Sequence, residues 1–220
     1  MRRTALFLVI FMLVAVSSVS AASISVPENF AFPHVTVQGA WLPGAVYSVG
    51  NSANLSGGNK NFMLGGTLGF GGDFAGQCRV TTLNVPLQKI SGANQQVDGM
   101  LNEFNLLYKV DKNVIVYIGT TYTIGKMTNT TNSTEENSNS LGLQIGGMLD
   151  VPIYQELSGF ADYSIGSQIA QFSIGLEYRV VDAATLNLAY YNIQQYSLNY
   201  SGGNTSYTMQ GAAVGFSFDI

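Results

Sequence analysis

Residues 102–124, NEFNLLYKVDKNVIVYIGTTYTI, contain two runs of alternating side chains that are joined by a short turn. In the first run, Phe104 and Leu106 share one parity with other apolar residues, whereas Glu103 lies on the opposite parity with polar ones. The alternation resumes directly after the turn at 111–113. Because a period of two places successive side chains on opposite faces of a strand, this stretch predicts an antiparallel β-hairpin.

The same alternation continues along the chain, and no stretch shows a helical period. Strands are predicted over 34–49, 61–74, 78–90, 101–110, 114–124, 141–149, 157–165, 171–180, 186–190 and 211–220. Pro43 with Gly44 interrupts the first of these segments, and Pro86 interrupts the third. The sequence therefore predicts an all-β, antiparallel up-and-down barrel of ten strands, with eight strands as the alternative if 34–49 and 78–90 are lead-in and loop.

Short and long connectors alternate between these predicted strands. Short turns are expected around Gly76, at 111–113, around Pro152 and at 181–184, and longer polar loops at 50–60, 91–96, 126–138 and 201–205. A brief connector near Gly166 is the exception. Short turns at one end and longer loops at the other are typical of transmembrane barrels of the bacterial outer membrane.

The polar parity distinguishes a membrane barrel from a soluble protein. Charged residues make up only 10% of the chain, against about 25% in an average soluble domain. The polar parity is rich in Gly, Ser, Thr and Asn, as suits a narrow lumen, while apolar side chains would face lipid. A secreted soluble β-sandwich acting as a binding module is the alternative. Charges of both signs predict a lumen network that comprises Glu103, Lys109, Asp150, Asp162, Glu177, Arg179 and Asp219.

The N-terminus has the pattern of an export signal. Arg2 and Arg3 precede an apolar run, and small residues follow it near Ala21 and Ala22. The run of about twelve apolar residues is too short to cross a bilayer as a helix. We therefore expect a signal peptide over 1–22, a periplasmic lead-in over 23–33 and the barrel over 34–220.

Few residues of the chain are suited to catalysis or metal binding. The chain has one histidine, His34, and one cysteine, Cys78, so the usual His and Cys metal clusters are not expected. No partner for a catalytic histidine is marked, and no cofactor motif is present. The net charge of −4 and the scattered basic residues argue against a nucleic-acid partner. The sequence predicts a protein that is not an enzyme.

Several phrases resemble the strands of opacity-type, small porin-like bacterial outer-membrane β-barrel proteins: GGTLGFGGDF, NEFNLLYKV, VIVYIGTTYTIG, FSIGLEYRV and AAVGFSFDI. The resemblance implies a location in the bacterial outer membrane, contact with its lipid, and insertion by the barrel assembly machinery. That machinery would read Phe216, Phe218 and Ile220 in the last strand, although the chain ends in Ile220 where Phe is usual.

The expected function follows from this class of protein. We expect an anchor that presents surface loops and has at most a narrow pore, because a barrel this small is filled by side chains. The alternative is a carrier or porin for small apolar solutes. A host or surface ligand is not identified by any motif.

Overall fold

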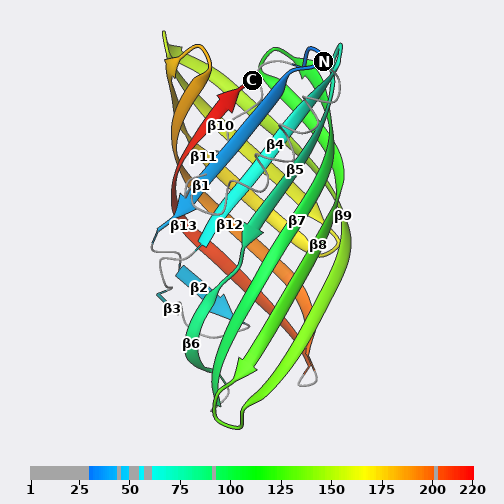
Figure 1. Ribbon diagram of the computed structural model, residues 1–220, viewed down its shortest axis with the longest axis vertical. Coiled ribbons are helices and arrows are strands. Elements are labelled where there is room, and N and C mark those ends of the chain that lie inside the picture. The colour runs from blue at the N-terminus through cyan, green and yellow to red at the C-terminus, as the bar shows by residue number, and fades with distance from the viewer. Residues whose placement is uncertain (1–29, 44–45, 50–54, 57–60, 91–92, 201–202) are drawn as a thin grey trace.

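The chain forms a closed antiparallel β-barrel (Figure 1). The computed structural model describes residues 30–43, 46–49, 55–56, 61–90, 93–200 and 203–220. Strand β1 (Val35–Leu42) pairs with β4 (Asn61–Gly71) on one side and with β13 (Gly203–Asp219) on the other. This pairing of the first strand with the last closes the barrel and leaves the membrane-embedded sheet without a free edge.

Ten strands make up the wall within the described ranges, and two of them are interrupted. Strand β2 (Val46–Val49) continues β1 along β13 and pairs with the short β3 (Leu55–Ser56), and β6 (Val85–Ile90) continues β5 (Phe74–Thr82) along β7. The remaining strands are β7 (Ala93–Asp111), β8 (Val114–Asn129), β9 (Thr134–Tyr154), β10 (Leu157–Gly166), β11 (Ile169–Val181) and β12 (Ala184–Tyr200). The ten-strand prediction is confirmed. The eight-strand alternative is wrong because both interrupted segments pair as strands.

Short turns lie at the same end of the barrel as the C-terminus, at the top of Figure 1. Two of them differ from the prediction. The turn expected around Gly76 lies at Gly72 and Asp73, where Gly72 has a φ of 61° that favours glycine. The turn expected around Pro152 instead follows Tyr154, where β9 ends. Pro152 lies within β9 and pairs with β10, but it is beyond Leu149, the last residue of β9 that pairs with β8. Pro152 therefore has a strand partner on one side only, where its missing N–H is tolerated.

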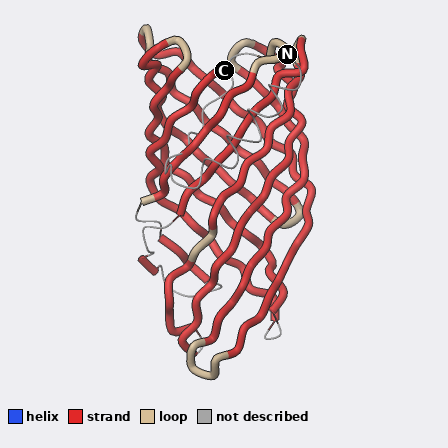
Figure 2. Tube along the Cα trace, in the orientation of Figure 1, coloured by secondary structure: helices blue, strands red, loops and turns tan. Residues whose placement is uncertain are grey.

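At the opposite end, segments predicted as long loops continue as paired strands (Figure 2). Strand β8 extends to Asn129 and β9 begins at Thr134, so most of the expected loop 126–138 is a β-ribbon. The expected loops 91–96 and 201–205 likewise contain the starts of β7 and β13. Both faces of such a ribbon meet water, so the alternation disappears although backbone pairing continues. The short turns at the other end make this the extracellular side.

The two faces of the wall have the polarity of a membrane barrel. Large apolar side chains cover the outside and are exposed, with Leu141 at 70% and Leu143 at 66% as the extreme cases. These outward apolar side chains form a belt around the barrel. The belt ends on the extracellular side where two charged residues, Asp98 of β7 and Lys126 of β8, are paired neighbours. Buried polar residues line the inside. This closed barrel with an apolar exterior excludes the soluble sandwich. Within the described ranges, no helix is long and apolar enough to cross a membrane.

The single tryptophan allows a direct test of lipid contact. Trp41 lies on the outer face of β1, between Phe62 of β4 and Val214 of β13, and its side chain is 39% exposed. In liposomes made with brominated acyl chains, we expect most of its fluorescence to be quenched, because bromine quenches an indole that contacts lipid. A Trp41→Phe variant gives the background signal. Unquenched emission from the reconstituted wild-type protein would contradict the lipid-facing position.

Candidate functional site

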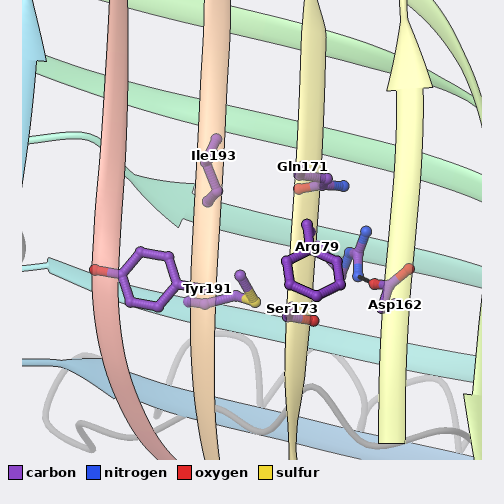
Figure 3. Close-up of a pocket in the computed structure, with 8 residues that line it drawn as sticks. Arg79, Asp162, Gln171, Ser173, Tyr191 and Ile193 are labelled. Carbon is purple, nitrogen blue, oxygen red and sulfur yellow. Dashed lines mark hydrogen bonds and ion pairs between the residues drawn. The ribbon is translucent and has the colours of Figure 1, made fainter.

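A buried ion-pair cluster crosses the centre of the lumen. The guanidinium of Arg79, on β5, donates from Nη1 to Asp162 Oδ2 at 2.6 Å and from Nη2 to Glu103 Oε1 at 2.9 Å. All three side chains are buried, with exposed fractions of 5% or less. Figure 3 shows Arg79 and Asp162 directed toward each other from facing strands. These three residues are called the Arg79 cluster below.

Neutral polar side chains add hydrogen bonds to this cluster, although Arg79 Nε and Glu103 Oε2 have no hydrogen-bond partner within the described ranges. Gln144 and Gln171 each donate from Nε2 to Glu103 Oε1, at 2.9 and 2.6 Å. Tyr117 donates its hydroxyl to Asp162 Oδ1 at 2.8 Å. Gln144 Nε2 also donates to Asn105 Oδ1 at 2.8 Å. Because buried charges are tolerated when they are paired and hydrogen-bonded, the network explains how charged groups reside at membrane depth.

Glycines on the lumen face make room for the larger members of the network. A Cβ atom on Gly146 would lie 2.3 Å from the ring of Tyr117, and one on Gly119 would lie 2.0 Å from Asn105 Oδ1. A Cβ atom on Gly175 would lie 2.8 Å from the ring of Phe160. Each distance is far below van der Waals contact. The glycines on the polar parity thus pair with large side chains from neighbouring strands.

Apolar side chains fill the lumen on both sides of the Arg79 cluster. On the periplasmic side these are Leu107, Ile115, Met148 and Phe160, and on the extracellular side Leu42, Met63, Leu101, Ile193 and Met209. Farther toward the extracellular end, Gln195 accepts a hydrogen bond from Thr123 and donates one to Ser140, at 3.0 and 3.3 Å. The lumen is therefore packed like a protein core, with a polar layer at its centre.

The space left beside the cluster is small. A cavity of about 10 Å³ lies against Arg79 and Asp162, and Ser173, Tyr191 and Ile193 also line it (Figure 3). Such a volume is at the lower limit for one water molecule. A second cavity, of about 80 Å³, lies at the periplasmic end and is lined by Asp150, Glu177 and Arg179, among others.

The structure divides the seven charged residues proposed from the sequence into two groups. Glu103 and Asp162 meet at Arg79 in the centre of the lumen. The other five, Lys109, Asp150, Glu177, Arg179 and Asp219, lie toward the periplasmic mouth. There, Asp219 accepts a hydrogen bond from Thr36 at 2.7 Å. Sequence reasoning missed Arg79, although Ala75, Gln77, Arg79 and Thr81 share the lumen parity of β5.

The residues suggested as an insertion signal share the lipid face of β13. Phe218 and Ile220 are exposed, and the rings of Phe216 and Phe218 meet edge to face with centroids 5.1 Å apart. Ile220 and Val35 exchange two backbone hydrogen bonds, of 2.8 and 3.2 Å. The end of the chain is thus fixed by its pairing with the first strand.

The single histidine and the single cysteine lie in separate parts of the barrel. His34 lies in the turn before β1, with Nε2 3.3 Å from Asp219 Oδ1. Cys78 is exposed on the outer face of β5. No three His, Cys, Asp or Glu side chains in the described part of the chain are grouped so that they could hold a metal ion.

Comparison with known proteins identifies the fold. No family model and no curated protein matches the chain. Among solved structures, it is similar to the outer membrane protease OmpT of Escherichia coli, with a TM-score of 0.52 and 8% identity over 90% of this chain and 99% of that one. It also matches the attachment invasion locus protein Ail of Yersinia pestis, with a TM-score of 0.44 and 9% identity over 85% and 97%. For the neisserial surface protein NspA, the TM-score is 0.43 with 12% identity over 84% and 95%.

At these identities the comparisons bear on the fold alone. The similarity to OmpT extends over nearly the full length of both chains. The location follows from the structure itself: a closed antiparallel barrel with an exposed apolar exterior is the architecture of a bacterial outer-membrane protein.

Proposed function

We propose that the protein is an outer-membrane anchor whose closed barrel holds extracellular β-ribbons in place, and that it is not an enzyme. The observation that supports this most strongly is the filling of the lumen. The Arg79 cluster lies between two layers of buried apolar side chains, and the cavity beside it measures only about 10 Å³. Barrels of this size have interiors that side chains can fill, whereas aqueous channels need more strands.

Side-chain contacts fix the shape of the ribbon formed by β8 and β9, as expected of a surface that is presented to a partner. Lys126 and Glu135 form an ion pair of 2.8 Å across it. In the turn at its tip, Asn129 Oδ1 accepts a hydrogen bond from Thr131 N at 3.0 Å, and Thr134 donates to Asn132 at 2.8 Å. The barrel therefore supports a surface of defined shape rather than a mobile loop.

The carrier for small apolar solutes remains the second candidate. The extracellular side of the lumen is apolar, as a carrier would require. A ligand pocket, however, typically encloses about 300–1,000 Å³. The two cavities described above measure about 10 and 80 Å³, well below that range, which favours the anchor over the carrier.

An enzymatic role is not proposed, although the solved structure of OmpT is that of a protease. The single histidine of this chain lies in the turn before β1, at the periplasmic end. It is thus at the opposite end of the barrel from the extracellular ribbons. Its Nε2 lies 3.3 Å from Asp219 Oδ1, and that carboxylate also accepts a hydrogen bond from Thr36.

Electrical recording distinguishes a closed barrel from a pore. Folded protein reconstituted into planar bilayers is expected to give no stable conductance steps, because ions would have to cross two apolar layers. A known porin in the same bilayers is the positive control. Stable unitary steps from the wild-type protein would refute the closed barrel. Saturable binding of a fluorescent fatty acid would favour the carrier instead.

A further inference from the structure

Residues Phe30–His34, here called the mouth strap, lie across the periplasmic end of the lumen before the first strand begins. The carbonyl of Phe30 accepts a hydrogen bond from Gly71 N, and the carbonyl of His34 accepts one from Gly69 N, both at 2.9 Å. His34 N donates to Ala31 O at 2.8 Å, which closes a turn between them. The mouth strap therefore occupies the edge of β4 just beyond the residues that pair with β1.

The strap lies on the lumen side of β4 because of a glycine. Gly69 is on the lumen parity, and a Cβ atom there would lie 2.4 Å from Ala31 O and 2.6 Å from Phe30 C. These are backbone atoms, so no small side-chain movement would relieve the contact. Only glycine at position 69 lets the strap approach this closely.

Both ends of the strap contact other strands at the mouth. The side chain of Phe30 is 2% exposed, and Lys109 Nζ, from β7, lies 5.8 Å from the centroid of its ring. At the other end, His34 approaches Asp219 of β13. Phe32, in contrast, is 69% exposed. The strap thus buries one aromatic ring in the mouth and leaves its other aromatic side chain on the surface.

We propose that the mouth strap is a periplasmic lid, which seals the lumen with Phe30 and can open without disturbing the wall. The Arg79 cluster is made of side chains whose backbones belong to three paired wall strands. The strap precedes β1, and its hydrogen bonds to β4 lie outside the β1–β4 register. The lid goes beyond the proposed anchor, which requires closure only at the centre of the lumen.

A buried thiol beneath the strap tests the lid. Ala75 is fully buried on the lumen face of β5 and pairs with Gly69. In a Cys78→Ser background, Ala75→Cys is labelled with a small charged maleimide in the folded, full-length protein in detergent. A buried thiol reacts only when the site opens, so the labelling rate reports the open population. Phe30→Ala is expected to raise this rate at least about tenfold, the factor that corresponds to about 1.4 kcal/mol.

Matched variants separate lid opening from general loosening. Gly69→Ala, which displaces the strap by contact, is expected to raise the rate as Phe30→Ala does, and it is the second variant if Phe30→Ala does not fold. Gly66→Ala, whose Cβ would meet nothing closer than Thr36 O at 3.7 Å, is expected to leave the rate unchanged. An Ala213→Cys reporter, buried on β13, should stay slow in every variant.

Two results would overturn the proposal. One is an unchanged rate at position 75 in folded Phe30→Ala or Gly69→Ala protein. The other is an equal acceleration at positions 75 and 213, because a lid opens only the mouth. Heat-modifiable migration on a gel confirms that each variant is folded.

Discussion

Replacing Arg79 by methionine is expected to destabilise the barrel by about 3–5 kcal/mol, the usual result of removing one partner from a buried ion pair. The substitution would leave the carboxylates of Glu103 and Asp162 buried at membrane depth without their cation. The measurement is the urea midpoint for unfolding from detergent micelles or thin liposomes, followed by heat-modifiable migration and by Trp41 fluorescence. We expect a clear shift of the midpoint to lower urea.

Two comparisons show whether the lost stability comes from uncompensated charge. The triple variant with Arg79→Met, Glu103→Gln and Asp162→Asn is expected to regain much of the loss, because it removes the charges together. Lys126→Ala breaks a partly exposed pair on the ribbon and should cost less than about 1 kcal/mol. If Arg79→Met shifted the midpoint no more than Lys126→Ala does, the cluster would not be a stabilising element.

The second large effect is expected at Gly146. A valine there would place Cβ 2.3 Å from the ring of Tyr117 and 2.6 Å from Tyr163 O, a backbone atom. Tyr117 would have to leave its position, and Asp162 Oδ1 would lose its hydroxyl donor. Overpacking costs about 1–3 kcal/mol and an unsatisfied buried acceptor a similar amount, so we expect a loss of about 3 kcal/mol or more in the same urea assay.

The predicted loss of stability comes from the crowded lumen around Gly146, and the same substitution at a glycine with open space around it serves as the control. Gly66→Val on the lipid face of β4 should change stability little, because the nearest atom to its Cβ is 3.7 Å away. Combining Gly146→Val with Tyr117→Ala should be less harmful than the sum of the two single changes, since the ring is then gone. Full additivity of the two losses would show that the contact between these residues is not responsible.

The wall strands could be predicted because one of their faces meets lipid and the other meets a polar lumen. In β7, this contrast separates Phe104 and Leu106 from Glu103 and Asn105, and the structure shows the same division. The extracellular ends of the strands could not be predicted in this way. Both faces of the ribbon at Lys126 and Glu135 are in water, so pairing continues there without any alternation of polarity.

The centre of the lumen was harder to predict than its lining. Parity alone put Glu103 and Asp162 inside, but it could not say which charges would meet. Arg79 reaches Asp162 although β7, β8 and β9 lie between their two strands in the sheet. Such a contact depends on the tilt and stagger of all the strands, which no local pattern specifies. Pro86 also interrupts the alternation of the predicted segment 78–90, which contains Arg79.

The ribbon of β8 and β9 affects how another molecule would recognise this protein. From Leu141 to Thr134, the ribbon rises roughly 24 Å along the strand at about 3.4 Å per residue. Its side chains are held at fixed spacings by two strands, so Lys126 and Glu135 form part of one surface although they belong to different strands. An isolated hairpin is only marginally stable in water. A free peptide with the sequence of 126–138 would therefore be a poor immunogen for antibodies against the folded protein, whose epitopes here are conformational.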